Sequence, residues 1–171
     1  MERWRKQESH RIAKNTCSKL NISCTNAQKD LKISTSQVQV LVELVLENLE
    51  VKCDEISIHF VEKKVISRLH LTHFNDPSST DCISFPMDTP STESELPIIL
   101  GDVFVCPHTA IAYALKNNTS PYLEVSLYII HGILHLLGFK DIKKEDKAKM
   151  RAQEKRCLCY LKEKKAFLCP Y

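Results

Sequence analysis

Hydrophobic residues along this chain follow two kinds of spacing, and these predict its secondary structure. Apolar and polar residues alternate, as in half-buried strands, in four stretches: residues 20–24, 55–61, 81–85 and 102–106. Apolar residues recur at helical spacing in five stretches: residues 34–48, 62–71, 107–117, 121–137 and 143–165. A loop rich in Pro, Ser and Thr is expected over 86–97. With no internal repeat, this mixture predicts an α+β fold in which a small mixed β-sheet packs against helices.

One helix is expected at the centre of the fold. The stretch 121–137 is apolar on nearly all sides, since Ile129 and Ile133 oppose Leu127 and Leu134. A helix that is apolar all round is a buried helix. The last helix, in contrast, is highly charged and is expected to face the core at three positions: Met150, Cys157 and Leu161.

The central helix carries a pattern typical of metal ligands. His131 and His135 are four residues apart, so their imidazoles lie one helical turn apart on the same face and can reach a single ion. Gly138 follows as the expected left-handed residue that ends the helix. The chain then turns back, and Asp141 can supply an oxygen as the third ligand. These residues form the candidate metal site.

A site with three protein ligands keeps a fourth position open, which is typical of a catalytic metal that activates a water molecule. The alternative is that the two histidines are ordinary core residues bonded to the backbone. The complete spacing, H-x-x-x-H-x-x-G-x-x-D, favours the metal, because it supplies the pair, the turn and the third ligand together. Zinc is the expected ion, with another divalent transition metal as the alternative. The sequence therefore predicts a small metal-dependent hydrolase.

Composition narrows the setting of this predicted hydrolase. The 171 residues are 43% hydrophobic and 26% charged, which suits one hydrolase domain over 20–171. Residues 1–19 are polar, basic and without periodicity, and are expected to be a mobile N-terminal extension. No long apolar stretch or secretory signal is present, so we expect a cytoplasmic protein with no membrane partner. The eight cysteines are scattered, and we interpret them as reduced thiols.

The spacing of the site is shared by two kinds of protein. Metzincin metallopeptidases place a glutamate directly after the first histidine as general base, but this chain has Gly132 there. The run HGILHLLGFKD instead resembles the signature of the YbeY endoribonucleases, which are ribosomal RNA maturation factors. Two further blocks, TDCISFP (80–86) and LGDVFVCP (100–107), are similar to strands of that family and occur in the same order. From Leu20 onward the resemblance spans nearly the whole chain.

The resemblance implies a specific activity. It implies a metal-dependent endoribonuclease acting on single-stranded RNA, which matures the 3′ end of small-subunit (16S) ribosomal RNA and aids ribosome quality control. The implied partners are ribosomal RNA and the small ribosomal subunit. Two other functions stay open. The protein could be a non-catalytic, metal-stabilised ribosome assembly factor, or a metzincin-like metalloprotease.

The chain departs from the YbeY pattern at two places. The third ligand is usually histidine in that family, whereas this chain has Asp141, whose harder carboxylate still suits a metal. The family also tends to place an arginine shortly before the TDCISFP strand, but this chain has Phe74 in that neighbourhood. Arg68 and His73 lie near the missing arginine in sequence and are the candidates to replace it as a phosphate clamp.

The remaining candidate residues are charged side chains near the expected site. Lys140, Lys143 and Lys144 follow the ligand turn and are candidates to bind phosphate, or else begin a solvated helix. Asp102 is a candidate to orient a histidine through its second nitrogen or to receive a proton, or else a strand-end residue. Aromatic residues make up 7% of the chain, without an alternating basic and aromatic stripe. This favours an enzyme over a pure RNA-binding module.

Overall fold

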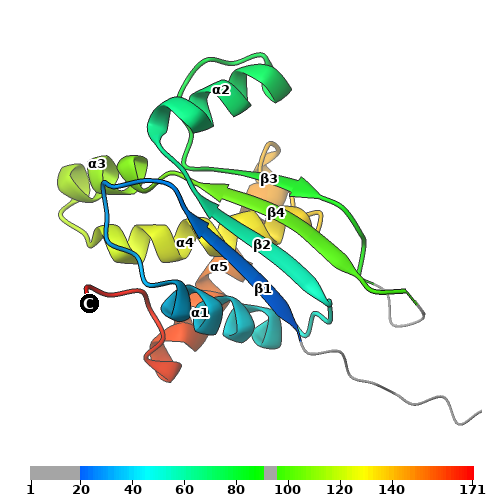
Figure 1. Ribbon diagram of the computed structural model, residues 1–171. Helices are drawn as coiled ribbons and strands as arrows, with labels where there is room; N and C mark the ends of the chain where they lie inside the picture. Colours follow the sequence, from blue (N-terminus) through cyan, green and yellow to red (C-terminus); the bar gives the residue numbers. More distant parts are fainter. Residues whose placement is uncertain (1–19, 91–95) are drawn as a thin grey trace, which may run out of the picture.

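The computed structural model describes residues 20–90 and 96–171, and the predicted N-terminal extension lies outside them. Its fold is α+β, as predicted (Figure 1). The strands of its mixed sheet are β1 (Asn21–Asn26), β2 (Glu55–Phe60), β3 (Cys82–Pro86) and β4 (Ile99–Val105). The helices are α1 (Thr35–Asn48), α2 (Lys63–Phe74), α3 (Pro107–Asn117), α4 (Pro121–Leu136) and α5 (Lys144–Lys164).

The sheet places its strands in the order β1-β2-β4-β3. β1, β2 and β4 are parallel, and β3 pairs antiparallel with β4 at one edge. Helices α1, α4 and α5 lie together on one side of the sheet, while α2 lies beyond one end of it (Figure 1). The sheet is mixed because β3 runs antiparallel to the other strands, and both β3 and β4 pack against the central helix α4.

Helix α4 is the buried centre that the sequence predicts. Ile129, Ile130, Ile133 and Leu134 are all fully buried. Their burial stabilises the fold, since a fully buried aliphatic side chain contributes about 1.5–3 kcal/mol over an exposed one. The three predicted anchors of α5 are buried too, which confirms that this charged helix covers α4 with one narrow apolar stripe: Met150, Cys157 and Leu161.

Gly132 allows α4 to approach the sheet closely. A Cβ atom at this position would lie 2.3 Å from Cγ1 of Val103 on β4. The hydroxyl of Ser84 on β3 also donates a hydrogen bond to the carbonyl oxygen of Gly132, at 2.9 Å. A glutamate could not occupy this position without displacing the sheet, so the general base of a metzincin peptidase has no place here.

Several element boundaries differ from the prediction by a few residues. β4 begins at Ile99 instead of residue 102, because Gly101, with φ of 135°, interrupts the alternation that marks a strand. α2 continues to Phe74 instead of residue 71, and ends where Asn75 adopts a left-handed conformation with φ of 56°. Ser34 caps the start of α1, and its side chain accepts a hydrogen bond from the Gln37 amide.

The cysteines agree with the expectation of reduced thiols. The seven cysteines within the described ranges are all free thiols. Among the same residues, no helix combines the length and the apolar character needed to cross a membrane.

Candidate metal centre

Three side chains meet at the C-terminal end of α4. Nε2 of His131 lies 2.9 Å from Nε2 of His135, and 3.8 Å from Oδ2 of Asp141. The candidate ligand atoms of the three residues all lie within 4.8 Å of one another, and this is the group of the described residues that could hold a metal ion. The structure therefore brings together the three residues that the sequence singled out.

A tight turn after α4 explains how Asp141 reaches the histidines. Leu137 ends the helix, and Gly138 follows with φ of 85°, a left-handed conformation that glycine adopts without strain. The amide of Gly138 donates to the carbonyl of His135, and the amide of Phe139 donates to the carbonyl of Leu134. This pair of hydrogen bonds is the Schellman motif expected at a glycine-terminated helix, and it reverses the chain.

The same turn orients the second histidine. Nδ1 of His135 lies 2.9 Å from the carbonyl oxygen of Phe139. Since a carbonyl oxygen can only accept a hydrogen bond, Nδ1 carries the proton and Nε2 presents its lone pair to the site. The residue that closes the helix thus also fixes the tautomer of a ligand.

Glu154 orients the first histidine from another helix. Its Oε1 atom lies 2.6 Å from Nδ1 of His131, which donates the hydrogen bond and leaves Nε2 free to bind a metal. Burial lowers the pKa of His131, but this hydrogen bond, together with the charges of Glu154, Asp81 and Asp141, outweighs burial and raises the pKa above its ordinary value. The carboxylates of Glu154, Asp81 and Asp141 therefore favour a positive charge on or beside the His131 ring.

The donor set fits a divalent transition metal. Both imidazoles donate through Nδ1, so their Nε2 atoms face each other across 2.9 Å, where the lone pairs of two neutral rings would repel unless a proton or a metal ion is shared between them. Two imidazoles and a carboxylate are ligands that zinc and related ions accept. A metal ion would relieve this repulsion and be neutralised in part by Asp141.

The candidate ligands lie between two hollows. The larger one, which we call the metal groove, has a volume of about 740 Å³. It is lined from three parts of the chain, namely α2, β3 and the turn after α4: His70, Phe74, Cys82, Ile83, Ser84, Pro86, His135, Gly138, Phe139, Lys140, Asp141 and Ile142. The smaller one, of about 170 Å³, contains His131, Asp141 and Glu154. Access to the candidate metal position from solvent is therefore available on both sides of Asp141.

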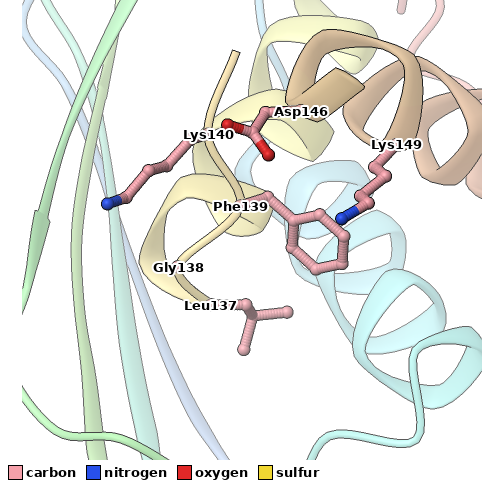
Figure 2. A pocket seen from close by; sticks show the side chains of 6 residues that line it. All are labelled: Leu137, Gly138, Phe139, Lys140, Asp146 and Lys149. Carbon is pink, nitrogen blue, oxygen red and sulfur yellow. The ribbon is translucent and has the colours of Figure 1, made fainter. Parts of the chain in front are cut away.

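The three candidate lysines differ in position. Lys140 lines the metal groove. It also borders a neighbouring hollow of about 310 Å³, where its side chain extends away from Asp146 and Lys149 and toward the side of the strands (Figure 2). Lys143 and Lys144 are exposed at the start of α5 and line none of these three hollows.

Two cations near His131 were missed by the sequence interpretation. Lys147 and Arg151, one and two turns into α5, line the smaller hollow beside His131 and Glu154. Their helical spacing of four residues is a signal that could have grouped them on one face of α5. The anchors of α5 indicate which face is buried, but its local spacing does not show that this face lies beside the candidate ligands on α4.

Asp102 is not brought to the metal ligands. Its Oδ1 atom lies 2.8 Å from Nε2 of His59 on the neighbouring strand β2. Val103 faces α4, so Asp102 points to the opposite side of the sheet. The histidine that Asp102 contacts is His59, which is not a candidate metal ligand and whose Nδ1 is hydrogen-bonded to the Thr25 hydroxyl at 2.8 Å.

Neither candidate replacement for the missing arginine lines the metal groove. His73 packs its ring edge-on against Phe85, at 4.7 Å between centroids, and Arg68 is exposed. The side chains of α2 that do line the groove are His70 and Phe74, four residues apart and hence on one face of the helix. The sequence interpretation had assigned no role to His70.

The fold and the side-chain group define a small α+β protein in which two histidines and an aspartate could hold a metal ion. A family model described as "Endoribonuclease YbeY" matches residues 23–162. The chain therefore belongs to the YbeY endoribonuclease family, as its sequence motifs predict.

Individual relatives match over almost their full lengths. The chain is 43% identical over 147 residues to the endoribonuclease YbeY of Protochlamydia amoebophila, with 86% of this chain and 97% of that protein covered. It is 40% identical over 158 residues to that of Chlamydia pneumoniae, covering 90% and 98%. A solution structure of a Thermotoga maritima protein has the same fold, with a TM-score of 0.55 and 21% identity over 85% of this chain and 95% of that one.

Proposed function

We propose that this protein is a metal-dependent endoribonuclease that cleaves single-stranded RNA. The observation that carries the proposal is the convergence of His131, His135 and Asp141 at one edge of an open groove, in a chain of the YbeY family. Zinc is the proposed ion, bound singly, because two imidazoles and one carboxylate leave a further coordination position for water or substrate.

The residues of the site divide the work of hydrolysis among them. A bound divalent metal would lower the pKa of a water molecule and offset negative charge on the scissile phosphate. His131 and His135 hold fixed orientations through Glu154 and the Phe139 carbonyl, so the ligands need no rearrangement during the reaction. Lys140 is the proposed cation for a phosphate oxygen, since it is the positively charged side chain that lines the metal groove.

The proposed substrate is ribosomal RNA. By similarity to its YbeY relatives, the protein would mature the 3′ end of small-subunit ribosomal RNA and contribute to ribosome quality control. Its partners would be that RNA and the small ribosomal subunit, in the cytoplasm. Support comes from the family membership and from a groove wide enough to accept a nucleotide, since ligand sites commonly measure about 300–1,000 Å³.

A cleavage assay tests this function directly. The purified protein, loaded with one equivalent of zinc, is mixed with a single-stranded RNA carrying the 3′ end of the small-subunit ribosomal RNA, and products are resolved on a gel. We expect cleavage by the wild type and by Glu145→Ala, which removes an exposed carboxylate in the first turn of α5. Asp141→Ala should be inactive. Equal cleavage by Asp141→Ala would contradict the proposal, and binding without cleavage by all three would favour the assembly-factor alternative.

A further inference from the structure

The wall of the metal groove opposite the ligand turn carries two aromatic rings. His70 and Phe74 lie one turn apart on α2, with ring centroids 5.4 Å apart and an interplanar angle of 46°. Both rings line the groove. Phe74 is 58% exposed, so its ring is accessible to a ligand in the groove. We call His70 and Phe74 the aromatic shelf.

The aromatic shelf is held in place before any ligand binds. Nδ1 of His70 donates a hydrogen bond to the carbonyl of Ser78, at 3.0 Å. The loop that contains Ser78 is itself closed, because the Ser78 amide donates to Oδ1 of Asp76 at 2.8 Å. Asn75, in its left-handed conformation, ends α2 directly after Phe74, whose ring contacts that of His70. A ring fixed in advance loses little conformational entropy on binding.

The far rim of the groove is apolar as well. Ile142 follows the candidate ligand Asp141 directly, lines the same groove and is 90% exposed. A flat ligand lying in the groove would cover both Phe74 and Ile142 and remove their apolar surface from water. Such burial is favourable in proportion to the area covered.

The charge of the groove excludes recognition by phosphate contacts alone. Of its 12 lining residues, Lys140 is the one lysine or arginine, and Asp141 carries the opposite charge. Proteins that bind single-stranded nucleic acid combine backbone charge with stacking of bases on aromatic rings. Lys140 and a bound metal ion can hold the phosphate next to the ligands, and stacking would supply the binding of the base beside that phosphate.

We propose that the aromatic shelf is a nucleobase-binding subsite, on which an unpaired base of RNA next to the scissile phosphate stacks against Phe74. This proposal rests on the proposed endoribonuclease function, whose site shares the groove. The subsite takes one base from a single strand, because the bases of a duplex are already stacked on each other. Purines should bind more tightly than pyrimidines, since stacking grows with the area of the base.

Binding measured without cleavage tests the subsite apart from the metal. The probes are a single-stranded RNA hexamer with 2-aminopurine at its centre, the same hexamer with an abasic site at its centre, and a duplex of the first. Fluorescence and affinity are recorded with the full chain in a chelator at fixed salt, because phosphate contacts depend on salt. The variants are Phe74→Leu, which keeps apolar volume but removes the ring, and Phe74→Trp, which keeps stacking. The matched control is Tyr113→Leu, which removes an exposed aromatic ring from α3.

The wild type should quench 2-aminopurine and bind the intact hexamer on the order of tenfold more tightly than the abasic hexamer or the duplex. Phe74→Leu should lose both the quenching and that difference, whereas Phe74→Trp and Tyr113→Leu should keep them. Equal affinity of wild type and Phe74→Leu for the intact hexamer would overturn the subsite. So would tighter binding of an extended apolar peptide than of the hexamer, because the groove would then be a peptide site along β3.

The two proposals can fail separately. Quenching that depends on Phe74, in a protein that never cleaves RNA when loaded with zinc, would contradict the nuclease and keep the base-binding subsite. Cleavage that depends on Asp141, with binding unchanged in Phe74→Leu, would keep the nuclease and overturn the subsite.

Discussion

Glu154 and His131 are joined by a hydrogen bond of 2.6 Å between Oε1 and Nδ1, although they lie 23 residues apart on different helices. The carboxylate comes from α5, which otherwise covers α4 with a few apolar anchors. The orientation of a candidate metal ligand thus depends on how α5 packs, and the affinity of the site for a metal depends on it too.

Replacing Glu154 by Gln should weaken metal binding without removing the ligands. The amide keeps an acceptor for His131 but loses the charge that makes the imidazole a better donor, and changes of this kind typically reduce metal affinity about 10- to 100-fold. Competition titration with a chromophoric chelator measures the effect. Glu163→Gln, which removes an exposed carboxylate near the end of the same helix, should leave affinity unchanged. Equal affinity in both variants would show that Glu154 does not support the ligand.

His135→Ala should abolish stoichiometric metal binding, since it leaves one imidazole and one carboxylate. The wild type should melt at a higher temperature with zinc than with a chelator, because an ion that binds the folded state stabilises it by about 2.7 kcal/mol at 100 times its Kd. The variant should lack this difference. Elemental analysis and thermal melts measure both effects, with His73→Ala, an exposed histidine packed on Phe85, as control. Full metal content in His135→Ala would rule out the ligand assignment.

Asp141→His should tighten zinc binding. An imidazole suits this borderline ion better than a carboxylate does. Zinc and manganese titrations of wild type and variant, compared side by side, provide the measurement. We expect the ratio of zinc to manganese affinity to rise, and a ratio that stays constant or falls would argue against Asp141 as a ligand.

Gly132→Ala should destabilise the fold although alanine is the better helix former. The added Cβ would lie 2.3 Å from Cγ1 of Val103, a stiff, fully buried side chain. Overpacking of this kind costs about 1–3 kcal/mol, which exceeds the gain of about 0.5–1 kcal/mol in helix propensity. Urea unfolding measures the net loss. Val103→Ala opens the space that the added Cβ needs. The double variant should therefore lose less stability than the sum of the losses of the two single variants. Strict additivity would place the clash elsewhere.

Lys140→Ala should weaken RNA binding and reduce its dependence on salt. Affinity falls with salt, and the loss of one phosphate contact makes the slope of log affinity against log salt less negative by roughly 0.7 for a single strand. Binding of a single-stranded RNA is measured at several salt concentrations with a chelator present. Lys143→Ala, at an exposed position outside the metal groove, is the matched control and should keep the wild-type slope. The same slope for all three proteins would remove Lys140 from the phosphate site.

The sequence could predict the candidate ligands because their geometry is local. His131 and His135 are placed by the period of one helix, and Gly138 marks the left-handed turn that returns the chain to Asp141. The mixed α+β fold was predictable for a similar reason, since each strand and helix carries its own hydrophobic spacing. Where the spacing is interrupted, as by Gly101 in β4, the prediction placed the boundary three residues late.

The rest of the site arises from packing between distant elements. Glu154 lies at helical spacing between the anchors Met150 and Cys157, so its face of α5 is predictable, but its contact with His131 depends on how α5 packs on α4. The spacing of His70 and Phe74 groups them on one face of α2, but only the position of β3 brings that face to the groove. Asp102 was a reasonable partner for a ligand histidine by residue type, yet strand alternation turns it to His59 on the other side of the sheet.

The Schellman turn at the end of α4 links the candidate metal site to local unfolding. The carbonyl of Phe139 holds the ring of His135, and the amide of the same residue closes the helix at Leu134. Helix ends usually open first, and amide hydrogen exchange detects this opening. An ion bound by His131, His135 and Asp141 would have to be released before this end could open. The terminus of α4 should then exchange its amide hydrogens as slowly as the middle of the helix, at a rate set by the concentration of free metal.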